Sequence, residues 1–133
     1  MDHVVFDAET LIAYYWDEPG SDAVEGIIDR VENGQLKGSV NTVTCTEVRC
    51  VCGRDDPQTA QAYVTRIRNW CDVVTAEAVW ESAADYKRDY NVALGDAFTL
   101  ATAAMEGATA YTGADDDFDD VDVTVTRFRE DGV

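Results

Sequence analysis

Short apolar runs alternate with helix-like segments along this chain, and the alternation constrains the fold more than any other feature. Strand-like runs stand at residues 3–7, 36–40, 73–74, 108–112 and 121–128. Strands that alternate with helices are typical of parallel sheets whose crossover helices cover both faces. We therefore expect an α/β protein with three layers, α/β/α, around a central, mostly parallel sheet.

Capping and turn signals predict where the helices begin and end. Helices are expected at residues 9–16 and about 42–52, where apolar residues recur at helical spacing. Further helices are expected to begin at Ser21, Asp56-Pro57, Thr75 and Gly95. We expect all of these elements to form a single domain, residues 1–133, with a frayed end at residues 130–133.

The composition is globular but unusually acidic. Hydrophobic residues make up 46% of the chain, and no run approaches the roughly 18 apolar residues of a membrane span. The N-terminus does not have the form of a secretory signal, so we expect a cytoplasmic protein. Acids outnumber bases by 27 to 10, for a net charge of −17. Molar salt shortens the screening length to roughly 3 Å, so this charge favours a halophilic, salt-rich cytosol over an acidic mesophilic protein.

Five acidic residues stand where strand ends and helix starts would meet. Asp7 ends the first apolar run, and Asp115 and Asp117 follow the run at 108–112. Glu47 lies early in one expected helix, and Asp96 opens another. Sites in parallel sheets form beyond the carboxyl ends of the strands. Clustered carboxylates repel one another unless a divalent cation neutralises them, so the sequence predicts a catalytic metal site.

Each of these acids also has a structural interpretation that the sequence leaves open. Asp7 can cap the following helix, and Asp96 can favour the dipole of its own helix. Thr44-x-x-Glu47 matches a capping box, in which Glu47 would bond the backbone of residue 44. The aspartate-rich run at 115–122 can be a solvated loop, although it fails the EF-hand pattern for calcium.

The cysteines and the histidine do not form a known zinc pattern. There is no Cys-x-x-Cys, and His3 is the only histidine. We expect the four thiols to be free in a reducing compartment; they are Cys45, Cys50, Cys52 and Cys71.

Taken together, the acidic motifs resemble those of PIN domains, specifically the VapC-type toxin ribonucleases. The resemblance runs from Val4 to about Phe128. Its motifs are Val-Val-Phe-Asp7-Ala, Thr-Glu47-Val, Gly-Asp96-Ala and Thr-Gly-Ala-Asp115-Asp-Asp117-Phe. No motif is specific alone, but their order and spacing are.

The resemblance implies a set of site residues and a cofactor. Asp7, Glu47, Asp96 and Asp115 would be the acidic quartet, and Asp117 an auxiliary ligand. All-oxygen ligands select Mg²⁺ or Mn²⁺ over zinc. The run at 115–117 leaves the register of the late ligand open by one residue.

One position departs from the family pattern. The family usually has Ser, Thr or Asp two residues after its first aspartate, whereas Glu9 stands there in this chain and Thr10 follows. The sequence does not decide which of the two takes that supporting role.

By resemblance, the chain would hydrolyse RNA with a metal-activated water, pair with a VapB-like antitoxin and form a homodimer. Two further interpretations stay open. Asp7-Ala-Glu9-Thr10 resembles the start of haloacid-dehalogenase-type phosphatases, but Glu9 replaces their general acid and no lysine follows Lys87. An inactive PIN scaffold that only binds a protein partner is the non-enzymatic alternative. A response-regulator receiver lacks the required mid-chain aspartate and late lysine.

Overall fold

The central layer of the protein is a five-stranded, wholly parallel sheet with the strand order β3-β2-β1-β4-β5. The computed structural model describes residues 1–113 and 116–129. The strands are β1 (His3–Phe6), β2 (Lys37–Asn41), β3 (Asp72–Val74), β4 (Thr109–Thr112) and β5 (Val125–Arg127). The predicted parallel α/β architecture is confirmed.

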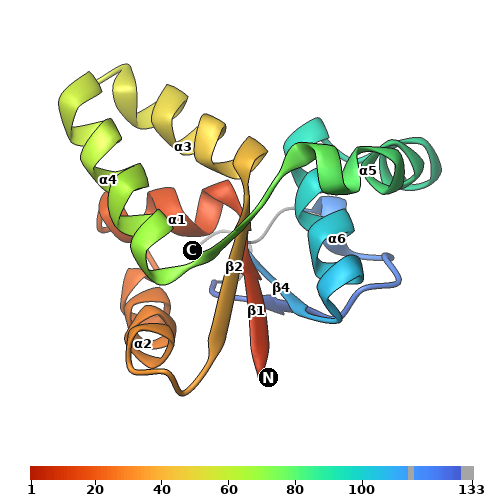
Figure 1. Ribbon diagram of the computed structural model, residues 1–133, viewed down its shortest axis with the longest axis horizontal. Helices are drawn as coiled ribbons and strands as arrows, with labels where there is room; N and C mark the ends of the chain where they lie inside the picture. Colours follow the sequence, from red (N-terminus) through yellow and green to blue (C-terminus); the bar gives the residue numbers. More distant parts are fainter. Residues whose placement is uncertain (114–115, 130–133) are drawn as a thin grey trace.

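Helices cover both faces of this sheet, which makes the three layers (Figure 1). One face carries α1 (Ala8–Tyr15), α2 (Ser21–Glu32), α3 (Thr42–Gly53) and α4 (Pro57–Trp70). The other carries α5 (Ala76–Tyr90) and α6 (Leu94–Glu106). A short 3-10 helix, η1 (Asp116–Phe118), lies between β4 and β5.

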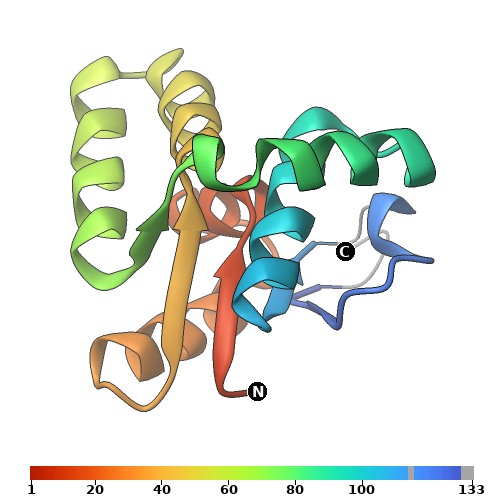
Figure 2. The same cartoon turned by 45° about the vertical axis from the view of Figure 1, so that its right-hand side comes forward.

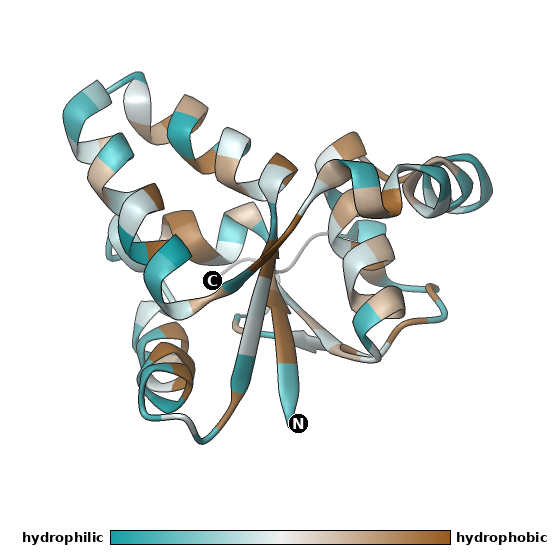
Figure 3. Cartoon of the chain, in the orientation of Figure 1, coloured by the Kyte–Doolittle hydropathy of each residue, from teal (hydrophilic) through white to brown (hydrophobic). Residues whose placement is uncertain are grey.

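The alternation of side chains along β1 divides the core between the two faces. Phe6 packs with the helices of the first face, where its ring meets Trp70 at 5.2 Å between centroids. Val5 points the other way and packs with Ala103 of α6. Both are fully buried, as expected for a central parallel strand. Figure 3 shows the hydrophobic colouring of β1 and the hydrophilic outer turns of α4 and α5.

The register of the sheet sets which residues meet at the carboxyl ends of its strands. Phe6 of β1 pairs with Tyr111 of β4, so Asp7 and Thr112 follow side by side. Figure 2 shows α3 starting at the carboxyl end of β2, with β1 beside it. The edge predicted to hold the acidic site is therefore formed by the ends of β1, β2 and β4.

Two of the predicted helix caps are confirmed and one is wrong, and one predicted helix start is displaced. Asp56 accepts a hydrogen bond from Gln58 N–H, and Thr75 from Ala78 N–H. Ser21 is not a cap: Gly20 holds that position with a φ of 91°, a conformation that suits glycine. Gly95 does not precede α6 but lies in its first turn, because the N-cap is Ala93.

The last strand is shorter than predicted. It covers Val125–Arg127 instead of residues 121–128. Asp122 stands in a bend before it and accepts a hydrogen bond from the Tyr86 hydroxyl at 2.6 Å. Residue 122 therefore lies outside the sheet.

None of the helices in the described ranges has the length and apolarity to cross a bilayer.

The net charge of −17 predicts a strong dependence of stability on salt. Raising KCl from 0.1 to 2 M should raise the melting temperature by on the order of 10 °C, because screening removes repulsion that unfolding would relieve. Thermal unfolding followed by circular dichroism measures this. The same titration at pH 4, where many carboxylates are protonated, should give a smaller rise. Equal melting temperatures at both salt concentrations would contradict the prediction.

Candidate metal-binding active site

Asp7 is a buried carboxylate held between β1, α1 and β4. It is the N-cap of α1, and its Oδ1 accepts a hydrogen bond from Thr10 N–H at 2.8 Å. Its Oδ2 accepts one from the Thr112 hydroxyl at 2.5 Å. Only 3% of Asp7 is exposed. The capping role and a place in the site are therefore both compatible with its geometry.

Burial raises the pKa of Asp7 to about 6, well above its ordinary value. The hydrogen bonds from Thr10 and Thr112 oppose this shift by stabilising the charged form. The nearby Glu9 carboxylate raises the pKa further. At neutral pH the ionised group costs folding energy that a bound cation would recover.

Glu47 does not belong to a capping box, so that alternative is wrong. The N-cap of α3 is Asn41, whose Oδ1 accepts a hydrogen bond from Val43 N–H at 2.8 Å. Thr44 is therefore inside the helix, and its buried hydroxyl has no hydrogen-bond partner among the described residues. The Glu47 carboxylate instead lies against Gly95 of α6, in space that a Cβ on residue 95 would fill. Burial raises the pKa of Glu47.

Asp96 and Asp117 form a contact at the start of α6. Asp96 lies in the first turn of that helix, next to Gly95. Asp117 accepts a hydrogen bond from Ala93 N–H at 2.8 Å. A side-chain hydrogen bond with Asp96 is the main cause that lowers the pKa of Asp117. Two ionised carboxylates in contact repel each other, and a bound cation would relieve that repulsion.

Of the side chains that the sequence predicted as ligands, Glu47 of α3 lies against Gly95 of α6, and Asp96 of α6 contacts Asp117 of η1. Asp7 makes its own contacts with Thr10 and Thr112. Asp115 lies outside the described residues. Among residues 1–113 and 116–129, no three acidic, histidine or cysteine side chains form a group close enough to hold an ion. The donor chemistry, oxygen throughout with a carboxyl pair in contact, fits a hard divalent cation.

Of Glu9 and Thr10, only Thr10 is hydrogen-bonded to Asp7. Thr10 supports Asp7 through its amide, while its hydroxyl donates to the Tyr111 carbonyl at 2.9 Å. The Glu9 carboxylate lies instead against Gly113, in space that a Cβ there would fill. Its Oε1 pairs with Arg129 at 3.2 Å, whereas its buried Oε2 has no hydrogen-bond partner in the described part of the chain.

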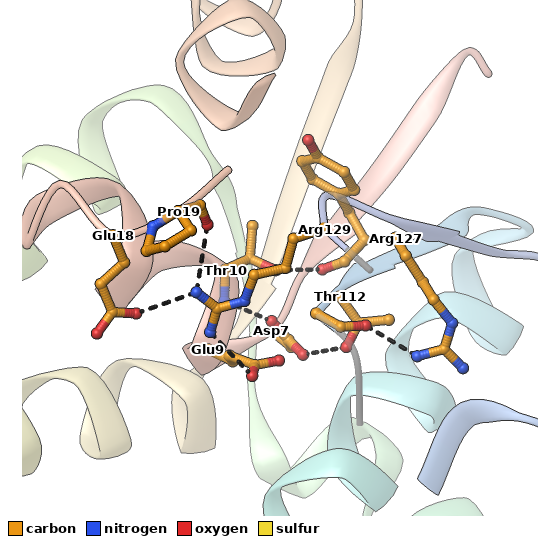
Figure 4. A network of polar contacts seen from close by, with 10 residues as sticks. Asp7, Glu9, Thr10, Glu18, Pro19, Thr112, Arg127 and Arg129 are labelled. Atoms are coloured by element: carbon orange, nitrogen blue, oxygen red, sulfur yellow. Dashed lines mark hydrogen bonds and ion pairs between the residues drawn. The ribbon is translucent and has the colours of Figure 1, made fainter. Parts of the chain in front are cut away.

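Sequence reasoning missed Thr112 as a partner of Asp7 and the two glycines that make room for Glu47 and Glu9. Two arginines near the C-terminus form ion pairs, Arg127 with Asp119 and Arg129 with Glu9. Figure 4 shows their guanidinium groups on opposite sides of the Asp7–Thr112 pair. The strand register could have indicated Thr112, since it follows the residue paired with Phe6.

Comparisons with known proteins identify the family of this chain. The sequence profile of the PIN domain matches residues 4–124. The chain belongs to the PIN domain family. Members of this family are generally nucleases that use divalent metals. Comparison with curated protein sequences gives no significant match.

Two solved structures share the fold at low sequence identity. A toxin-antitoxin complex from Klebsiella pneumoniae contains a chain with a TM-score of 0.71 and 18% identity, covering 96% of this chain and 98% of that one. The structure of VapBC2 from Rickettsia felis, bound to a DNA fragment from the promoter, contains a chain with a TM-score of 0.72 and 9% identity. The match covers 94% of this chain and 98% of that one. Membership of the PIN family replaces the phosphatase and receiver alternatives.

The raised pKa of Asp7 predicts that Asp7→Asn stabilises the metal-free protein. When an acid has a higher pKa in the folded state than in the unfolded state, the protein becomes less stable as the pH rises from the unfolded pKa to the folded pKa. For Asp7 this range runs from about 4 to about 6. A shift of about two units corresponds to roughly 3 kcal/mol at pH 7. Urea unfolding in EDTA at pH 7 should therefore give a larger free energy of unfolding for the variant.

The exposed Asp22→Asn makes the same charge change and should not reproduce this gain. Between pH 4 and 6, the variant at residue 7 should also lose part of the pH dependence of the wild type. A variant no more stable than wild type at pH 7 would show that Asp7 is not under this electrostatic cost.

Proposed function

We propose that this chain is a Mg²⁺- or Mn²⁺-dependent endoribonuclease of the VapC type. The observation that carries the proposal is Asp7, a carboxylate buried at the carboxyl end of β1. Glu47 against Gly95 and Asp96 in contact with Asp117 add acids at the other predicted ligand positions. A buried ionised carboxylate costs stability without a cation, which supports metal-dependent chemistry.

Asp7, Glu47 and Asp96 would hold the ion, together with Asp115 and Asp117. A divalent ion supplies an activated water and neutralises negative charge on a phosphodiester during hydrolysis. The protein residues fix the ligands: Thr112 and the Thr10 amide fix both oxygens of Asp7. The single histidine, His3, is the first residue of β1, whereas Asp7 follows its last residue. His3 is hydrogen-bonded to Ser39, so it does not serve as a base in this site.

The proposal includes partners and a setting. The structural neighbours are a toxin-antitoxin complex and VapBC2, which supports a VapB-like antitoxin for this chain. A homodimer and a salt-rich cytoplasm complete the proposal, the latter supported by the net charge of −17. The acidic surface also gives little general attraction for RNA, so substrate binding would depend on the ion and on few arginines.

Metal-dependent RNA cleavage tests the activity. In about 2 M KCl, the wild type should cleave single-stranded RNA with Mg²⁺ or Mn²⁺ and not with EDTA. Asp7→Asn and Glu47→Gln should each reduce cleavage by about 100-fold or more, as expected when a ligand that positions the reacting groups is lost. Glu77→Gln, at an exposed acid in the first turn of α5, is the control and should cleave like wild type.

The same preparation separates the alternatives. Phosphate release from a small phosphomonoester, without RNA cleavage, would contradict the nuclease proposal. Tight binding of a co-expressed antitoxin, with no hydrolysis under any metal condition, would support the inactive scaffold.

Gly95 gives a second test that keeps every acid in place. Gly95→Ala puts a Cβ where the Glu47 carboxylate lies, so the flexible glutamate must move. Cleavage should fall by about 100-fold, since small displacements of positioned groups are costly. Helix stability should rise by roughly 0.5–1 kcal/mol, because alanine favours a helix over glycine.

Gly26→Ala is the matched control for this test. Gly26 lies in α2, where an added Cβ would have no neighbouring atom within 4 Å, so the substitution should give the same helix gain and leave cleavage unchanged. If both glycine variants cleaved RNA equally well, Glu47 would have no role in the active site.

A further inference from the structure

Arg127 joins the two sides of the connection between β4 and η1. Its Nη1 donates to the Gly113 carbonyl at 2.8 Å, directly after β4. Its Nη2 pairs with the Asp119 carboxylate at 2.7 Å, directly after η1. The planar guanidinium presents its donors in a fixed geometry, so the two contacts set the distance between these points.

The sheet fixes the arginine itself. Arg127 is the last residue of β5 and pairs with Thr112 of β4, the residue whose hydroxyl holds Asp7. The next residue, Phe128, donates its N–H to the Thr112 carbonyl at 2.9 Å. The Arg127 side chain is 29% exposed, compared with 58% for Asp119. Such an ion pair adds little stability alone, so its main effect is geometric.

The geometry extends from Asp119 to the candidate ligands. Asp119 N–H donates to the Asp116 carbonyl at 3.0 Å, which closes the turn that carries Asp117. Asp117 in turn contacts Ala93 N–H and Asp96 at the start of α6. A displacement of Asp119 would therefore move Asp117 relative to Asp96.

We propose that Arg127 is a positioning residue for the candidate metal site, holding η1 so that Asp117 stays against Asp96. This inference rests on the proposed function, because it assigns the arginine to the same site. It also distinguishes Arg127 from a substrate contact, since both of these donors face the protein's own oxygens.

Two measurements on Arg127→Gln test the proposal. The Ala93 amide should exchange at least about tenfold faster, because its acceptor is Asp117. The dissociation constant for Mn²⁺, measured by electron paramagnetic resonance in 1–2 M KCl, should rise about 10-fold or more, the usual effect of losing a supporting contact. Asp119→Asn should have a similar effect, and the double variant should add little to it.

Arg88→Gln is the control with the same change of charge. Arg88 is exposed on α5, where it pairs with Asp85 and Asp89, so its loss should leave both measurements unchanged. Unchanged Ala93 exchange in Arg127→Gln, or an equal change in Arg88→Gln, would overturn the positioning role. A wild type that binds no Mn²⁺ would overturn the proposed function itself, while the exchange result would still decide whether Arg127 holds η1.

Discussion

The position of Asp7 in the sheet is the constraint on which the rest of this site depends. Its amide donates to the Tyr111 carbonyl at 3.2 Å, which continues the β1–β4 ladder by one residue. Its side chain then caps α1 and accepts from Thr112. A carboxylate is thus fixed by strand, helix and neighbouring strand at once, in a buried position where its charge is costly. Under the proposed function, such fixation would make Asp7 a preorganised ligand that does not need to be ordered when a cation binds.

The acidity of the chain acts on two length scales. Over the surface, 27 acids repel across distances that molar salt screens. At Asp7, salt screens little, because the carboxylate is buried. Screening therefore stabilises the surface, whereas a proton or a bound cation would relieve the electrostatic cost at Asp7. The salt and Asp7→Asn measurements separate these two contributions.

The sequence predicted the fold, and the places of Asp7 and Asp96 within it, because each depended on a local pattern. Asp7 follows a short apolar strand, and Asp96 opens an alanine-rich helix, so strand and helix rules were sufficient to place them. Glu47 had two local interpretations, and the capping box failed because Asn41, three residues before Thr44, caps α3 instead. The sequence did not show that β2 ends at Asn41, so it could not identify Asn41 as the N-cap of α3.

The contacts made by Arg127 and Arg129 could not be predicted in this way. Arg129 reaches Glu9 across 120 residues, and Arg127 reaches Gly113 across 14. Neither contact follows from the spacing of residues within one element. Both require the parallel pairing of β5 with β4, and the sequence predicted that strand with the wrong length.

The two glycines of the site connect these local and long-range effects. Gly95 and Gly113 each occupy a point where a glutamate carboxylate lies against the backbone, and a Cβ at either would displace that carboxylate. Sequence rules read such glycines as helix boundaries or turns, because the rules consider only the residue's own backbone. Here the missing side chain creates space for an acid from another element. The positions of Glu47 and Glu9 therefore depend as much on these two glycines as on the helices that carry the acids.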